Sequence, residues 1–139
     1  MEGFKIRWMA VGDLDCLGKI SEKSGVKIPL LEMTRKSDVI CVVSELDGSI
    51  NGFALYRFCP SKIIIKHLIV DEKFRRMGVA TRLITRLFSK MSEKRSFIEI
   101  KVSEYNLAAH FFLKAMSFKA EDIIRNCNES EYAFRRHLN

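Results

Sequence analysis

The chain has 139 residues, of which 47% are apolar and 29% are charged, and its formal net charge is +7. This length and composition predict a single globular domain over residues 1–139 and exclude a disordered or low-complexity protein. No apolar run reaches the roughly 18 to 20 residues that a membrane span needs, and the N-terminus lacks the apolar core of a signal peptide. We therefore expect a cytoplasmic protein with no membrane partner, and the positive charge favours an anionic ligand or an anionic assembly such as a ribosome.

Cysteine usage gives no sign of a metal centre or a disulfide framework. The four cysteines form no Cys-x-x-Cys pair and have no histidine at metal-ligand spacing. We predict reduced thiols, most of them buried, and no bound metal. The cysteines are Cys16, Cys41, Cys59 and Cys127.

The N-terminal region predicts a strand followed by a helix. Phe4, Ile6 and Trp8 recur at every second position, which is the period of a half-buried strand. Asp13 is a candidate N-cap for a first helix, because a carboxylate can accept hydrogen bonds from the free N–H groups of a helix start. Gly25 is predicted to end this helix.

A β-hairpin is predicted next. Residues 27–36 are expected to form a short irregular or helical connection, and apolar runs follow at residues 39–45 and 52–58. The Asp47-Gly48 pair between these runs favours a tight turn, because both residues tolerate positive φ.

The central stretch predicts a buried strand, a sharp turn and an amphipathic helix. Residues 63–70 are mostly β-branched and apolar, whereas the apolar residues of 80–91 recur at helical spacing. The helix is expected to end near Lys94. Gly78 lies in the turn between the two elements, where backbone N–H groups point outward at the start of the helix.

Positive charge is concentrated at this turn and along this helix. Arg75 and Arg76 lie beside the expected N–H groups, and eight Lys or Arg residues occur between Lys73 and Arg95. This arrangement predicts an anion site, with a phosphate as its occupant. The alternative is a solvated helix face. The basic residues that step by four along the helix are Arg82, Arg86 and Lys90.

The C-terminal third predicts a strand, a helix and a second hairpin. The strand covers residues 97–103, the helix 106–116, and the two last strands 118–125 and 132–137. The order of elements predicts a mixed α/β (α+β) sheet of about seven strands, mostly antiparallel, with helices on both faces. The apolar residues that we expect the last helix to bury are Ala108, Phe111, Phe112, Ala115 and Met116.

Two motifs give the chain a resemblance to a known family. A strand ending at Val70 is followed by Arg75-x-x-Gly78-x-Ala80, which resembles the acyl-CoA motif of the GNAT N-acetyltransferases. The second signature of that family begins with Asn-x-x-Ala and ends with Gly-Phe. Its positions in this chain are Asn106, Ala109, Phe112, Leu113, Ser117 and Phe118.

The resemblance covers nearly the whole chain and implies the GNAT acyl-CoA N-acyltransferase fold. Among the subgroups, the chain looks most like the ribosomal-protein alanine N-acetyltransferases. The resemblance implies acetyl-CoA as cosubstrate, bound by the backbone of the turn, by the preceding strand and by the second motif. The residues implied are Leu68, Ile69, Val70, Arg75, Arg76, Met77, Gly78, Val79, Ala80, Thr81, Asn106, Phe112 and Leu113. Asn106 is also a plausible helix N-cap, and both roles can hold together.

The catalytic residues are less fully specified by the motifs. The Val70 backbone N–H is the expected oxyanion donor. His67 stands where many family members carry a glutamate, and an imidazole can accept a proton near neutral pH. Glu99 is a second candidate base. Leu113 replaces the family's general-acid tyrosine, and Tyr105 is a candidate substitute that would act through water.

Other polar residues near the second motif stay open as contributors. Lys101 occupies a position that is glutamate in the alanine-acetylating subgroup. Glu104 is a further candidate base, and Ser103 is a further proton donor through water.

Three functions are compatible with the sequence. The first is an N-acetyltransferase acting on a primary amine of a protein or peptide, with a ribosomal protein as one candidate acceptor. The alternative is a catalytically weak GNAT-fold protein that binds CoA or a partner in a regulatory role, as Leu113 and Lys101 suggest. A nucleic-acid-binding module is disfavoured, because basic and aromatic residues do not alternate as they do in RNA-binding proteins. We expect a monomer or a dimer.

Overall fold

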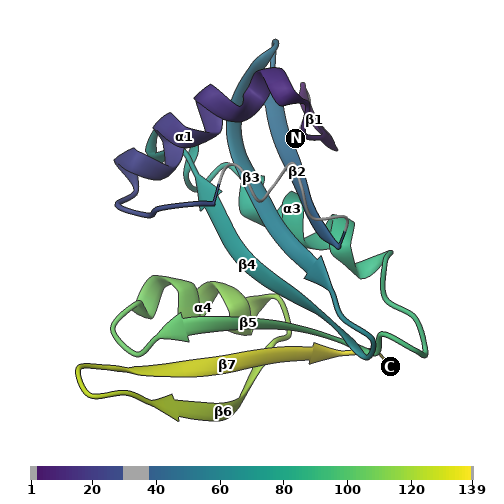
Figure 1. Ribbon diagram of the computed structural model, residues 1–139, viewed down its shortest axis with the longest axis vertical. Coiled ribbons are helices and arrows are strands. Elements are labelled where there is room, and N and C mark those ends of the chain that lie inside the picture. Colours follow the sequence, from purple (N-terminus) through teal and green to yellow (C-terminus); the bar gives the residue numbers. More distant parts are fainter. Residues whose placement is uncertain (1–2, 30–37, 139) are drawn as a thin grey trace. The chain divides into compact units, whose positions relative to one another are not determined.

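The computed structural model describes residues 3–29 and 38–138 (Figure 1). Seven strands form one sheet in the order β1-β2-β3-β4-β5-β7-β6. The β4–β5 pair is parallel, whereas β1–β2, β2–β3, β5–β7 and β6–β7 are antiparallel. The predicted mixed, mostly antiparallel sheet is therefore confirmed. The strands are β1 Phe4–Trp8, β2 Val39–Leu46, β3 Ser49–Phe58, β4 Lys62–Val70, β5 Phe97–Ser103, β6 Lys119–Arg125 and β7 Ser130–His137, and the helices are α1 Leu14–Lys23, α3 Val79–Phe88 and α4 Leu107–Ala115, with 3₁₀ turns η1 Val11–Asp13 and η2 Glu72–Phe74.

The chain forms two compact units that share strand β4. The first unit consists of Met1–Arg57 and His67–Lys90, and the second consists of Phe58–Lys66 and Met91–Asn139. A single domain over residues 1–139 stays a prediction. Residues 30–36 of the expected connection lie outside the described residues.

The hairpin of the first unit has the turn that its sequence predicts. Leu46 pairs with Ser49, so the loop contains two residues. Asp47 and Gly48 both have positive φ, 51° and 81°. This is the geometry of a type I′ turn, whose twist matches that of the flanking strands.

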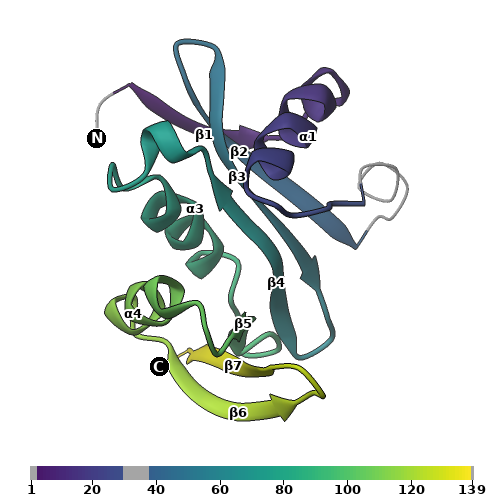
Figure 2. The same ribbon diagram turned by 90° about the vertical axis from the view of Figure 1, so that its left-hand side faces the viewer.

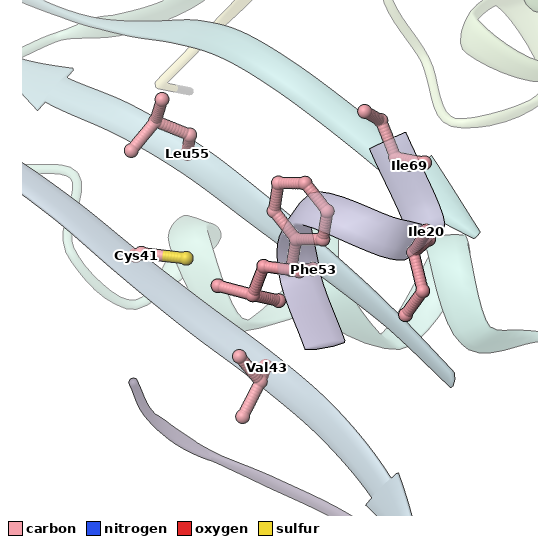
Figure 3. Packing of buried hydrophobic residues seen from close by; sticks show 7 residues of the cluster. Ile20, Cys41, Val43, Phe53, Leu55 and Ile69 are labelled. Atoms are coloured by element: carbon pink, nitrogen blue, oxygen red, sulfur yellow. The ribbon is translucent and has the colours of Figure 1, made fainter. Parts of the chain in front are cut away.

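Helices cover both sides of the strands in the first unit (Figure 2). On one side, Leu17 and Ile20 of α1 pack against β2, β3 and β4 in a buried cluster (Figure 3). Because side chains alternate along a strand, Val42, Ala54 and Tyr56 point to the other side, toward α3. The buried face of α3 consists of Val79, Leu83, Ile84 and Leu87. The strand residues of the first cluster are Cys41, Val43, Phe53, Leu55 and Ile69.

Two details of the first unit differ from the sequence prediction. Asp13 directly precedes α1, but its carboxylate does not cap that helix. It binds Arg7 at 2.8 and 3.0 Å and accepts a hydrogen bond from the N–H of Ala10 at 2.7 Å. The hydrogen bond with Arg7 lowers the pKa of Asp13. The arginine competes successfully for the carboxylate because an ionic hydrogen bond is stronger than a neutral one.

Helix α3 is also shorter than predicted, ending at Phe88 rather than near Lys94. The N–H of Lys90 bonds to the carbonyl of Leu87, which tightens the last turn. The Ser92 hydroxyl then accepts a hydrogen bond from the N–H of Arg95 at 3.1 Å. This local serine turn offers the backbone an alternative to the helix.

Helix α4 of the second unit buries a different face from the one predicted. Leu113 is the buried residue of this helix, whereas Phe111 is 68% exposed and Ala108 and Ala115 are exposed. The helix is apolar around most of its circumference, so its sequence pattern could not show which face meets the sheet. The ring of His110, three positions before Leu113, contacts strand β7 and fixes the orientation.

Candidate functional site

The turn between β4 and α3 presents backbone N–H groups as predicted. The Asp71 side chain accepts a hydrogen bond from the N–H of Lys73, so it caps the short η2 turn. The chain then adopts positive φ at Arg76 (65°) and at Gly78 (82°), and α3 begins at Val79. Gly78 is the N-cap residue and has no side chain that could cap the helix. The first N–H groups of α3 are thus available for a ligand.

The residues around this turn fit an anion. Arg75 and Arg76 are exposed, and Nε of Arg75 lies 3.4 Å from the carbonyl oxygen of Val70. A Cβ added to Gly78 would meet nothing within 4 Å, so the side of the turn that Gly78 faces is open. The partial positive charge of a helix N-terminus and two guanidinium groups both favour a phosphate. Met77 lies in the same turn, and the rest of the predicted segment, Val79, Ala80 and Thr81, forms the start of α3.

Arg82 does not belong to a solvated face. Its Nη1 lies 3.4 Å from the carbonyl oxygen of Phe4, and its guanidinium lies 5.8 Å from the centre of the Phe4 ring. This arginine therefore packs against β1. Arg86 is half-buried and Lys90 is exposed, so of these three basic residues only Lys90 fully matches the alternative of a solvated helix face.

The last residues of β4 lie immediately before the turn. His67 and Ile69 point to the α1 side, and Ile69 is part of the buried cluster (Figure 3). Leu68 and Val70 point to the α3 side. The side chain of Ile69 is committed to the core, which leaves its backbone as the part that could contact a ligand.

Glu99 lies in the second unit, where it is held by two basic residues. It is 2% exposed, and its two carboxylate oxygens lie 2.8 Å from Nε of Arg135 and 3.3 Å from Nζ of Lys62. Burial alone would raise the pKa of this carboxyl, but the hydrogen bonds to Arg135 and Lys62 outweigh it and the pKa is lowered. A carboxylate held in this way is a weak proton acceptor, so this geometry argues against Glu99 as the base.

The remaining predicted residues lie in β5, in the loop before α4 and along α4 itself. Oδ1 of Asn106 accepts a hydrogen bond from the N–H of Ala109 at 3.2 Å, so Asn106 is the helix N-cap. Tyr105 is 70% exposed, whereas Leu113 is 1% exposed. Phe112 is half-buried. The nearby polar candidates Lys101, Ser103 and Glu104 are exposed or half-buried.

Two polar features were missed at the sequence level. Nε2 of His110 lies 3.0 Å from the carbonyl oxygen of Ser103, and its ring packs on Tyr132 and Phe134. Its position four residues after Asn106 was the available signal. Asn51 is fully buried in β3, and the Asn51-Gly52 pair inside a strand pattern was a recognisable sign of a bulge.

Within residues 3–29 and 38–138, no group of three or more His, Cys, Asp or Glu residues is arranged to hold a metal ion. Over the same residues, no helix has the length and apolar character required to span a membrane. The cytoplasmic location stays a prediction.

Comparison with known proteins identifies a matching family and several similar solved structures. The family model described as "Acetyltransferase (GNAT) family" matches residues 13–118. The chain has no significant sequence match among curated proteins. Similar solved structures include the ribosomal-protein-S18-alanine N-acetyltransferase from Escherichia coli, with 15% identity, a TM-score of 0.86, and coverage of 97% of this chain and 94% of that chain.

Two other solved structures have the same fold. Ard1 from Thermoplasma volcanium is 22% identical, with a TM-score of 0.85 and coverage of 99% of both chains. NAA60 from Arabidopsis thaliana in complex with acetyl-CoA is 18% identical, with a TM-score of 0.82 and coverage of 97% of this chain and 98% of that chain. At these identities the likeness establishes the fold and leaves the acceptor open.

Proposed function

We propose that this chain, which belongs to the acetyltransferase (GNAT) family, transfers an acetyl group from acetyl-CoA to a primary amine of a protein or peptide. The acceptor is an N-terminal α-amine or a lysine. The observation that carries this proposal is the uncapped start of α3, with Gly78 in the left-handed conformation beside two exposed arginines.

The donor half of the reaction follows from that turn. The N–H groups of residues 76–81 bind the pyrophosphate of acetyl-CoA, because several convergent donors at a helix start match a phosphate. The backbone of Leu68 and Val70 bonds the pantetheine arm as an added strand would. The acetyl-CoA bound in the Arabidopsis relative supports this cosubstrate. The family motif assigns Asn106, Phe112 and Leu113 to the same cosubstrate.

The chemistry requires a neutral amine, an oxyanion donor and a leaving thiolate. His67 accepts the proton of the amine, directly or through water, and the amine nitrogen then attacks the thioester carbonyl carbon. The N–H of Val70 stabilises the oxyanion that forms. The nitrogen, which carries an extra proton after the attack, releases it to water. The C–S bond breaks, and the CoA thiolate leaves and takes up a proton. We prefer His67 to Glu99 as base, because ion pairs hold the pKa of Glu99 low.

Protonation of the thiolate is the step with the least support from side chains. Leu113 has no acidic proton to donate, and Tyr105 is exposed on the loop before α4. A thiolate is a fair leaving group without help, since a thiol has a pKa of about 8.5. General-acid assistance contributes about 10²- to 10⁴-fold, so its loss would slow the reaction without preventing it. Tyr105 acting through water is the proposed substitute.

An α-amine is the easier acceptor for such a site. Its pKa is about 7.7 to 8.0, compared with about 10.4 for lysine, so a larger fraction is neutral near pH 7. The E. coli neighbour is named for an alanine of ribosomal protein S18, which makes an amine of a ribosomal protein a candidate acceptor.

Two measurements test the proposal in sequence. Calorimetric titration should detect acetyl-CoA binding, and the absence of binding would remove the cosubstrate. Thiol release should then be measured with two matched peptides, one with a free N-terminus and no lysine, and one N-acetylated with a single lysine. Faster release with the first peptide would support the α-amine. Binding without turnover on either peptide would instead favour the regulatory alternative, which Leu113 motivates.

The proposed base has its own test. We expect His67→Ala to lose activity most strongly between about pH 6 and 8, where an imidazole exchanges its proton. His137→Ala is the matched control, because that histidine binds Glu121 at 2.9 Å and lies at an exposed position of β7. Full activity of His67→Ala across pH 6 to 9 would show that another group is the base.

A further inference from the structure

Strand β3 contains a bulge at Asn51. Ser44 of β2 pairs with Gly52, but the next residue, Glu45, pairs with Ile50, so Asn51 is an extra residue without a cross-strand partner. In a β-bulge, two residues of one strand oppose one residue of the other. Because the extra residue shifts the alternation of side chains by one position, Ile50 and Phe53 both pack into the cluster on the α1 side. Asn51 and Gly52 therefore share the opposite side, toward α3.

The bulge is packed directly against the candidate anion turn. A Cβ added to Gly52 would lie 3.0 Å from the carbonyl oxygen of Ile69 and 3.0 Å from Cγ1 of Val79. The N–H of Asp71 donates a hydrogen bond to the carbonyl oxygen of Asn51 at 2.8 Å. The bulge thus contacts the last residues of β4 and the first residue of α3, which are the two ends of the turn.

The side chain of Asn51 is buried at this place, and none of the described residues forms a hydrogen bond with it. Asn51 is 0% exposed, and among the described residues neither its Oδ1 nor its Nδ2 has a partner. Ser44, opposite Gly52 in the ladder, is also 0% exposed and its hydroxyl has no partner there. Unsatisfied buried polar groups destabilise a folded protein, and each one in a native structure calls for an explanation.

We propose that Asn51 is a positioning residue for acetyl-CoA binding, whose buried carboxamide bonds to the backbone at the β4–α3 junction when the pyrophosphate occupies the turn. This inference rests on the proposed function. Arg76 has φ 65°, which is strained for a residue with a side chain and persists only where the surroundings enforce it. Arg76 and Gly78 are already left-handed in the ligand-free structure. A hydrogen bond from Asn51 to the junction adds stability to this conformation in the CoA-bound protein, in which the N–H groups point at the anion.

The test measures the stability of the ligand-free protein and its affinity for CoA independently. In Asn51→Leu, a side chain of similar size replaces an amide that has no partner among the described residues. The melting temperature without ligand should therefore stay unchanged or rise. The affinity for CoA, measured by calorimetry, should fall about tenfold, which corresponds to the loss of one hydrogen bond. Asn126→Leu is the matched control, because Asn126 is exposed in the turn between β6 and β7.

A kinetic readout distinguishes positioning from a general structural role. For Asn51→Leu, the KM for acetyl-CoA should rise about tenfold while kcat changes less than twofold, since the amide contacts neither reacting group. Wild-type CoA affinity in Asn51→Leu would overturn the inference and leave the proposed function intact. A drop in unliganded melting temperature that accompanies the loss of affinity would also overturn it. Failure of the natural chain to bind CoA would overturn both.

A measurement on the natural chain covers the case in which Asn51→Leu does not fold. The side-chain NH₂ resonances of Asn51 in ¹⁵N-labelled protein should shift, and their hydrogen exchange should slow at least tenfold, when CoA is added. These changes report a newly formed hydrogen bond at the carboxamide. Resonances and exchange that stay unchanged at saturating CoA would refute the role of Asn51.

Discussion

Replacing Gly78 by alanine should weaken CoA binding much more than the same change at Gly25. Both glycines belong to the first unit and have positive φ, 82° at Gly78 and 72° at Gly25. An added Cβ would meet nothing within 4 Å at either position. The two substitutions therefore impose the same backbone strain without a steric clash inside the protein, and they differ in their distance along the chain from the anion turn.

The magnitude follows from the cost of the left-handed conformation. That cost is about 1 to 2 kcal/mol for a residue with a Cβ, and the stiffer unfolded chain offsets it by about 0.4 to 1 kcal/mol. We expect each variant to lose about 1 kcal/mol of stability, or about 3 to 5 °C in melting temperature. If the turn of Gly78→Ala relaxes to negative φ, it must return to the left-handed conformation when CoA binds. The free energy of this return weakens the affinity for CoA about 5- to 30-fold. If the turn does not relax, the new methyl group obstructs the approach of the phosphate to the backbone.

Thermal melting and calorimetric titration with CoA form the assay, with Gly12→Ala as a second control. Gly12 has no positive φ and open space around its Cβ position, so this variant should behave like the natural chain. Equal CoA affinities for Gly78→Ala and Gly25→Ala would refute the assignment of the turn as the phosphate site. The stability of the two variants then shows whether the strain argument itself is correct.

Three further predictions concern buried side chains. Glu99→Gln should lower the free energy of unfolding in urea by about 1 to 3 kcal/mol at pH 7, because Arg135 and Lys62 lose the buried carboxylate that binds both of them. Folding lowers the pKa of Glu99 below its ordinary value of 4.5, so the stability that its ion pairs contribute is complete above about pH 4.5 and is lost as the pH falls through the pKa of the folded protein. If the difference in unfolding free energy between the natural chain and Glu99→Gln were the same at pH 7 and pH 3, this reasoning would be contradicted. Phe53→Ala should lower the free energy of urea unfolding by about 3 to 5 kcal/mol, because Phe53 is 0% exposed, and a loss below about 1 kcal/mol would show that the cluster does not carry the core. Leu113→Tyr should lower the free energy of urea unfolding by about 1 to 3 kcal/mol, because the larger side chain overpacks a site that is 1% exposed. Unchanged stability together with faster thiol release would show instead that position 113 reaches the reacting groups.

The sequence alone determined the features that depend on neighbouring residues. The tight hairpin turn follows from Asp47-Gly48, because these residues tolerate positive φ. The succession of strands and helices follows from hydrophobic period, and the turn after β4 follows from the spacing of Arg75, Gly78 and Ala80. Ser117, which occupies the family's glycine position, has φ 70°, the left-handed conformation that glycine favours.

Only the tertiary structure decided the features that depend on partners distant in the chain. Glu99 and Arg135 are 36 residues apart, and their ion pair turns a candidate base into a carboxylate with a lowered pKa. The buried face of α4 was undetermined because apolar residues surround the helix, and the contacts of His110 with β7 selected it. The burial of Asn51 against the end of β4 likewise required the register of β2 on β3. Local sequence sets the backbone conformation, whereas a side chain's charge state and exposure are set by the residues that folding brings to it.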